Sequence, residues 1–330
     1  MRQLVFLLCA VTAIAQAPPP AAPPAASNPV LVRFQMQPKK GQPATDLVPT
    51  DIELREDGKP QPIVLFEGGR ARTLPVHVFL VFDCERSALA GVPLGPELLQ
   101  ENLLNAHENV AIGIYGFSGA AVRLTAPTRD PARLKKALDA AVFPRAATTF
   151  LFDHIQTVLR DAAATGPAIR MLVLFSNARP GLGAGPRSSE RELFAPTVRL
   201  AQESGVAVYP VLFRSPFGSQ ASDSNTTTSA SALGGSRNTM TEYSPDQSVL
   251  RSVGDFNNLG SATGGHSSEA LSNTNFLPGV LKWISKLIQD DYVAGFNPSS
   301  TGGGKRHKVE VVLRDKNRGK IVGGSINVVR

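Results

Sequence analysis

Cysteine is almost absent from this chain of 330 residues, which contains only Cys9 and Cys84. Cys9 lies in an N-terminal apolar run with the features of a secretory signal, so removal of that signal would leave Cys84 as the single thiol. One thiol forms no internal disulfide and no Cys/His zinc site, and the 5 histidines share no metal-ligand spacing. The fold must therefore depend on its hydrophobic core.

The N-terminal segment is interpreted as a signal peptide followed by a tether. Arg2 precedes an apolar run too short to span a bilayer comfortably, and Ala-Ile-Ala at 13–15 is a small-x-small cleavage site. We expect cleavage after residue 15, a Pro/Ala-rich linker over 16–28, and a secreted or periplasmic protein. A retained membrane anchor is disfavoured because no charge cluster follows, and a lipid on Cys9 because no small residue precedes it.

Aromatic side chains are also scarce, at 6% of the chain, whereas basic residues outnumber acidic ones and give a formal net charge of +7. The basic residues concentrate only at 304–308 (GKRHK) and 316–320 (KNRGK). Without interleaved aromatics these clusters do not indicate nucleic acid binding. We expect solvated strand and turn charges; the alternative is a structural or envelope scaffold protein that contacts an anionic surface through a basic C-terminal hairpin.

The two flanks of the chain have the patterns of short β-strands. Residues 29–70 alternate strands with polar turns, and the Asp57-Gly58 turn predicts antiparallel hairpins with one solvated face. Three more strands are expected within 291–330, at 292–296, 307–315 and 320–329. Each flank is too small to be stable alone, so we predict that they pair into one β-sandwich into which the central domain is inserted.

Residues 74–290 alternate buried strands with helices, which predicts an α/β fold with a doubly wound, mainly parallel sheet. The strands are near-continuous apolar runs at 76–82, 109–117, 169–176 and 206–213. Asp130 followed by Pro131 predicts a helix start, Thr148 or Thr149 another, and 276–291 an amphipathic helix. Residues 214–246, rich in Ser, Thr, Gly and Asn, are interpreted as a long flexible loop.

Polar side chains gather where the predicted strands end. Asp83 to Ser87 follow the first strand, Ser176 and Asn177 lie at the end of a later one, and Thr149 precedes a helix. Ligands of open parallel α/β sheets bind outside the carboxyl ends of the strands. The sequence therefore predicts an oxygen-rich binding site at this edge.

With these residues, the region 75–290 resembles a von Willebrand factor A (vWA) domain. The flanking stretches LVPTDIELREDGKPQPIVLFEGG, LGSATGG and DYVAGFNP resemble the acidobacterial group of vWA-related proteins, which are bacterial and secreted. The family's metal-ion-dependent adhesion site (MIDAS) begins with Asp-x-Ser-x-Ser, adds a Thr and ends with an Asp. Three positions match it: Asp83, Ser87 and Thr149. Two depart from it, because Glu85 replaces the first Ser and Asn177 replaces the final Asp.

The resemblance implies a non-enzymatic protein-binding module of the adhesion type, with an unidentified protein as its partner. Its partner-binding face would include Arg86, Thr148 and Ser176. The altered site permits two interpretations. In the first, the five aligned residues hold Mg or Mn; in the second, which we favour, Glu85 fills the metal position and Arg86 pairs with the carboxylates. No other cofactor and no integral membrane segment are expected.

Enzymatic alternatives lack a nucleophile with a base in reach. Ser118 in YGFSGA is not in a nucleophile elbow, because a strand and not a helix is expected to follow it. Cys84 has two acids beside it, which disfavour a thiolate paired with His77 or His154. GLGAG at 181–185 lacks a dinucleotide-binding fingerprint.

Overall fold

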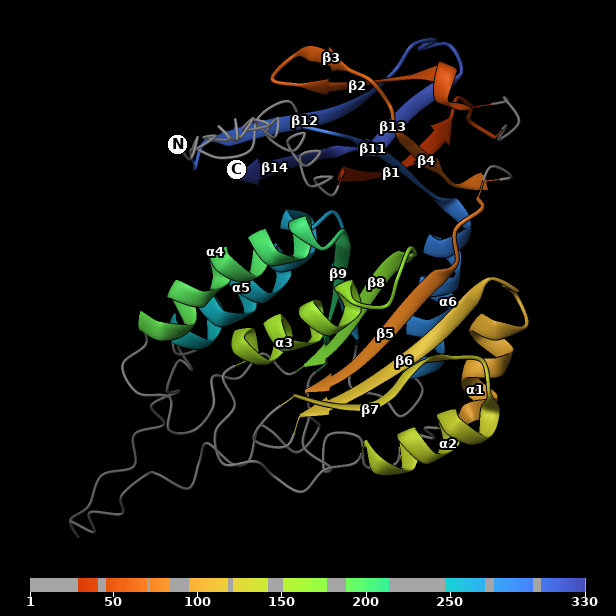
Figure 1. The fold of residues 1–330 in the computed structure, drawn as a ribbon, viewed down its shortest axis with the longest axis vertical. Coiled ribbons are helices and arrows are strands. Elements are labelled where there is room, and N and C mark those ends of the chain that lie inside the picture. The colour runs from red at the N-terminus through yellow and green to blue at the C-terminus, as the bar shows by residue number, and fades with distance from the viewer. Residues whose placement is uncertain are drawn as a thin grey trace, which may run out of the picture.

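The computed structural model describes residues 29–40, 46–69, 72–83, 95–117, 121–141, 151–176, 188–213, 247–270, 276–298 and 304–329. These residues form two parts, a six-stranded sheet covered by helices and a pair of four-stranded sheets packed face to face (Figure 1). None of the helices within these ranges is long and apolar enough to cross a membrane.

The six-stranded sheet has the order β10-β9-β8-β5-β6-β7 and is parallel except for β7, which runs antiparallel to β6. Its strands are β5 (Val76–Asp83), β6 (Val110–Phe117), β7 (Ala121–Thr128), β8 (Ile169–Ser176), β9 (Val206–Phe213) and β10 (Ser268–Ala270). Side chains alternate between the two faces: Leu80 and Phe82 belong to one buried cluster, and Phe79 and Val81 to the other. Both faces are thus buried, as the apolar runs predicted.

Helices cover each face of this sheet. One face carries α1 (Pro96–Leu99), the π-helical turn η4 (Gln100–Leu104), α2 (Pro131–Ala140) and α6 (Phe276–Asp290). The other carries α3 (Leu151–Ala163), α4 (Ser188–Glu203) and α5 (Gln247–Ala262) (Figure 1). Asp130 caps α2 as predicted, since its side chain accepts a 2.9 Å hydrogen bond from the Ala132 amide. The α1–η4 segment and the first half of α4 were not predicted.

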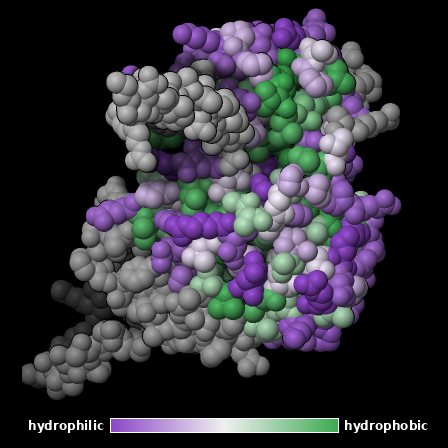
Figure 2. Space-filling model, viewed as in Figure 1, coloured by the Kyte–Doolittle hydropathy of each residue, from purple (hydrophilic) through white to green (hydrophobic). Residues whose placement is uncertain are grey.

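The two antiparallel sheets have the orders β13-β1-β11-β4 and β14-β12-β2-β3. Their strands are β1 (Val30–Pro38), β2 (Ile52–Glu56), β3 (Lys59–Gln61), β4 (Leu65–Glu67), β11 (Asp291–Phe296), β12 (Arg306–Leu313), β13 (Gly319–Gly323) and β14 (Ser325–Val329), and the short 3-10 turn η1 (Pro49–Asp51) precedes β2. They enclose one core, in which Phe34 and Leu54 from the N-terminal strands pack with Val309 and Ile326 from the C-terminal ones. On the face shown in Figure 2, hydrophobic residues show in the sandwich and, in smaller groups, on the α/β part.

The predicted fold class is confirmed, because a mainly parallel α/β sheet is flanked by an antiparallel module that N- and C-terminal strands build together. Two details were wrong. Only β2 and β3 form an N-terminal hairpin, around Asp57 (φ 48°) and Gly58 (φ 78°), whereas β1 and β4 each pair with β11. The expected single strand 320–329 is two strands in different sheets.

The domain boundaries stay predictions. The signal peptide and linker at 1–28 and the loop at 214–246 lie outside the described residues.

Candidate functional site at the carboxyl edge of the parallel sheet

The sandwich packs against the end of the α/β part at which the parallel strands begin (Figure 1). Arg33 of β1 donates a 2.8 Å hydrogen bond from Nη2 to the carbonyl of Arg170, the second residue of β8. Gln202, near the end of α4, donates to the Asn327 carbonyl of β14 at 2.8 Å. The carboxyl ends of the parallel strands therefore lie on the side away from the sandwich.

Strands β5 and β8 form the switch point of the sheet. The chain leaves β5 toward β6 on one side and later enters β8 on the other, so the connections that follow these two neighbouring strands diverge. The parallel register places Asp83, the last residue of β5, across from Ser176, the last residue of β8. Such a divergence is where open α/β sheets bind ligands.

Buried aromatic rings form the floor of this edge. Phe82 and Phe175 stack with ring centroids 5.0 Å apart and an interplanar angle of 9°. On the opposite face of the sheet, Phe117 at the end of β6 contacts the His154 ring in the first turn of α3, at 4.8 Å. These rings fix the strand ends and the start of α3 relative to one another, which is what a preorganised site needs.

The structure brings together two of the predicted site residues, Asp83 and Ser176. Ser176 is fully buried, at 0% exposure, so at this position it supports the edge and does not offer its side chain to a partner. The other predicted residues lie outside the described residues, and their roles stay predictions: Glu85, Arg86, Ser87, Thr148, Thr149 and Asn177. The contact of Phe117 with His154 places the first turn of α3 beside the end of β6.

The donor set predicted from the sequence fits a hard cation by its chemistry. Its members are carboxylate, hydroxyl and amide oxygens, which Mg²⁺ and Mn²⁺ prefer, and two of them carry charge. Within the described part of the chain, no group of three or more His, Cys, Asp or Glu residues is placed to hold a metal ion. Sequence chemistry alone therefore supports the cation.

The two histidines named as rival catalytic groups lie in different places, His77 near the start of β5 and His154 buried beside the carboxyl edge. His77 is the second residue of β5, six residues before Asp83, which places it roughly 20 Å from the carboxyl end of that strand. Its Nδ1 lies 3.2 Å from Thr165 Oγ1, and burial, together with the charge of Arg170, lowers its pKa. His154 is 7% exposed within α3. Ser118 and Cys84 lie outside the described residues, but β6 is followed by a strand, as expected.

The two basic clusters do not form one surface. Arg306 begins β12 and the 316–320 cluster follows its far end, so the two lie roughly 24 Å apart along the strand. Acidic side chains accompany both clusters: Lys308 lies 2.7 Å from Glu310, and Arg318 lies 2.6 Å from Asp51. This pattern agrees with solvated strand charge.

A buried polar layer between the two parts was missed from the sequence. The N-terminal strands were expected to have one solvated face, yet the charged residue Arg33 of β1 is only 8% exposed because it packs on the α/β part. Asp291 (4% exposed) and Tyr209 complete the layer. The available signals were a tyrosine within the apolar run VAVYPVLF and an acid at a junction of helix and strand.

No protein-family model matches the sequence, and no curated protein is similar to it. Similar solved structures exist. The von Willebrand factor domain of the type V pilus tip protein Mfa5 from Porphyromonas gingivalis is 14% identical, with a TM-score of 0.40 over 66% of this chain and 98% of that chain. BatB, a conserved hypothetical protein from Bacteroides thetaiotaomicron, is 14% identical, with a TM-score of 0.38 over 65% and 98% of the two chains.

Proximal thread matrix protein 1 from the mussel byssus, solved with a zinc-occupied MIDAS motif, is 12% identical, with a TM-score of 0.39. The likeness covers 69% of this chain and 48% of that protein. The Mfa5 domain is of the family that the sequence resembles. At these identities and TM-scores the likenesses say nothing of function, which must be argued from this chain's own residues.

Proposed function

We propose that this protein is a secreted or periplasmic, non-enzymatic module that binds a protein partner at the carboxyl edge of its parallel sheet. The observation that carries the proposal is the register of β5 and β8, which sets Asp83 across from Ser176 at the switch point. The predicted polar residues follow these two strands or precede α3 in the chain. The sandwich occupies the opposite end, so it does not cover this edge.

The chemistry of the edge favours binding over catalysis. The residues assigned to it supply oxygens and one guanidinium. His77 lies roughly 20 Å from the carboxyl end of β5, and His154 is buried against Phe117. We further propose that Glu85 and Arg86 fill the position of the metal, so that contact with the partner uses charged side chains directly. The alternative is an inert scaffold that contacts an anionic surface through the basic C-terminal strands. The structure does not support it, because the basic clusters at 304–308 and 316–320 lie apart and a residue of each is paired with an acidic side chain.

Charge reversal at the two ends of the molecule tests the proposal. The full chain is immobilised and exposed to extracellular proteins of the source cells, and capture is compared between wild type, Arg86→Glu and Arg306→Glu. Arg306 is exposed at the start of β12 and serves as the matched control. We expect a protein that wild type and Arg306→Glu retain and Arg86→Glu loses. The proposal is contradicted if the Arg86→Glu variant captures the protein as well as wild type does, or if only the Arg306→Glu variant fails to capture it.

A further inference from the structure

The two parts of the molecule meet at a buried polar contact, here called the joint: Arg33, Gln35, Arg72, Tyr209 and Asp291. Asp291 is its centre. It is the first residue of β11 and directly follows the last residue of α6, so the chain passes there from the α/β part into the sandwich. The Asp291 carboxylate accepts a 2.7 Å hydrogen bond from Gln35 Nε2 and a 3.3 Å hydrogen bond from the Tyr209 hydroxyl.

The joint ties together both connections between the parts. Arg72 lies on the segment that leads from the sandwich into β5, and its guanidinium donates to the carbonyls of Ile288 and Asp291 on the returning connection. Arg33 joins β1 to the start of β8 through the Arg170 carbonyl. A change in the position of Asp291 therefore acts on both connections between the two parts.

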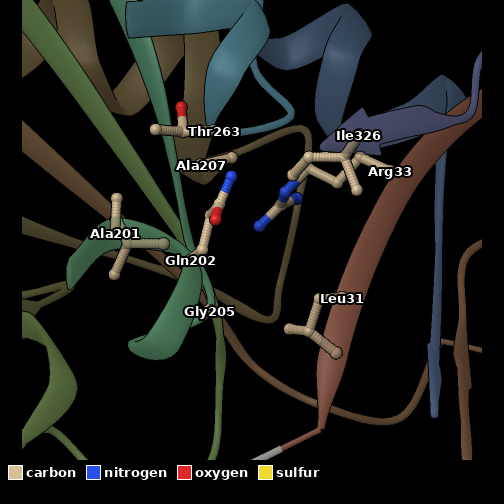
Figure 3. A pocket seen from close by; sticks show the side chains of 9 residues that line it. Leu31, Arg33, Ala201, Gln202, Gly205, Ala207, Thr263 and Ile326 are labelled. Carbon is tan, nitrogen blue, oxygen red and sulfur yellow. The ribbon is translucent and has the colours of Figure 1, made fainter. Parts of the chain in front are cut away.

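A small cavity borders the joint. Sandwich residues line one side of it and residues of α4, β9 and the end of α5 line the other: Leu31, Arg33, Ile326, Ala201, Gln202, Gly205, Val206, Ala207 and Thr263. The Arg33 guanidinium and the Gln202 amide point toward one another across it (Figure 3). Its volume of about 10 Å³ is close to that of a single water site. Arg33 is the residue that the cavity and the joint share.

Neighbouring groups offset the burial of Asp291 only in part. The groups that face it are Arg33 and Gln35 from β1, Tyr209 from β9, His266 after α5, and Arg72, whose guanidinium donates to the Asp291 carbonyl and whose charge also acts on this residue. Burial, the largest influence, raises the pKa of this carboxyl in spite of the hydrogen bond from Gln35 and the charge of Arg33. A carboxylate in such a place is stabilised by opening of the contact, because opening restores its hydration.

We infer that Asp291 makes the joint a pH-sensitive contact, closed when the carboxyl is protonated and loosened when it is ionised. The direction follows from proton linkage. The Asp291 carboxyl binds its proton more tightly in the closed joint than in the open one. Protonation therefore stabilises the closed joint fully below the ordinary pKa of an aspartate, and this stabilisation is lost as pH rises through the raised pKa of Asp291. Each unit by which the closed joint raises the pKa of Asp291 corresponds to about a tenfold change in the equilibrium constant for opening.

Amide hydrogen exchange of the full chain between pH 5 and pH 8, corrected for intrinsic rates, tests this inference. Val293 lies in β11 beside the joint, and Val173 lies in the centre of β8 as a reference. We expect protection at Val293 to fall as pH rises while protection at Val173 stays constant. Trp283, the single tryptophan of the chain, stacks edge-on against Tyr209 at 6.0 Å and should become more accessible to acrylamide over the same range.

Matched variants isolate the residue responsible. Asp291→Asn should abolish the pH dependence at Val293, whereas Asp290→Asn, at a more exposed carboxylate paired with Lys286 at 2.7 Å, should keep it. Tyr209→Phe removes a hydrogen bond that lowers the Asp291 pKa, so it should move the midpoint of opening to higher pH. The inference is overturned if Asp291→Asn retains the wild-type profile, if Tyr209→Phe leaves the midpoint unchanged, or if Val293 and Val173 change together.

Discussion

Glu85 and Asn177 are the two residues that separate the proposed site from an ordinary adhesion site. Glu85 brings back the negative charge that Asn177 lacks, so the number of carboxylates is unchanged. In the proposed plugged state, the longer glutamate side chain would fill the volume where a cation or its water would lie, and Arg86 would supply a competing positive charge. Whether the proposed site is free of metal therefore depends on the size of the side chain at position 85 more than on the net charge of the site.

Restoring the ordinary residues should therefore restore metal binding. We expect calorimetric titration of MgCl2 or MnCl2 into the full chain to show binding to the double variant Glu85→Ser/Asn177→Asp at least about tenfold tighter than to wild type, a difference of about 1.4 kcal/mol. Asn177→Asp alone is the control, since it adds a carboxylate without vacating the space. Equal affinity of wild type and the double variant would show that Glu85 is a ligand and not a plug.

At the scale of elements, a pair of glycines lets one stretch of chain serve both sheets of the sandwich. Gly323 (φ 72°) and Gly324 (φ 69°) adopt left-handed conformations between β13 and β14. A Cβ on Gly324 would lie 2.6 Å from Cγ2 of Ile321. These conformations send the chain from the edge of one sheet to the edge of the other, and other residues adopt them only with strain.

Gly324→Ala should consequently weaken the sandwich. We expect a loss of about 1–3 kcal/mol in the free energy of unfolding, measured by urea denaturation, because the alanine is both strained and crowded. The matched control is Gly279→Ala on an exposed position of α6, where a Cβ meets nothing within 4 Å. That change should stabilise the protein by about 0.5–1 kcal/mol. A neutral Gly324→Ala would mean that the two strands can be joined without the left-handed turn.

These glycines also show what local sequence could and could not reveal. The apolar runs of β5, β6, β8 and β9 predicted their strands almost to the residue, because strands buried on both faces tolerate little else. The carboxyl-edge site followed from where those runs end. The run 320–329 reads as one strand, since strand pairing is decided by contacts far away in sequence, and the burial of Arg33 depends on the same kind of long-range contact.

At the scale of the whole molecule, the N-terminal strands occupy central positions in both sheets of the sandwich. Strand β1 lies between β13 and β11, and β2 lies between β12 and β3. Their side chains Phe34 and Leu54 are fully buried against the C-terminal strands. Without the first part of the chain, the C-terminal strands would lack the side chains that complete their core. They would also lack the strands β1 and β2, with which β11, β13 and β12 form backbone hydrogen bonds.

Truncation of the chain to residues 74–330 should therefore yield insoluble protein. The fragment 74–330 would expose the apolar faces of β11, β12 and β14 together with unpaired strand edges, which promote aggregation. It would also lose Arg33, Gln35 and Arg72, so that Asp291 would be left without most of its partners. Solubility after expression and the cooperativity of thermal unfolding measure the outcome. A soluble fragment that unfolds cooperatively would contradict this expectation, because it would show that the α/β part and the C-terminal strands need no N-terminal partner to fold.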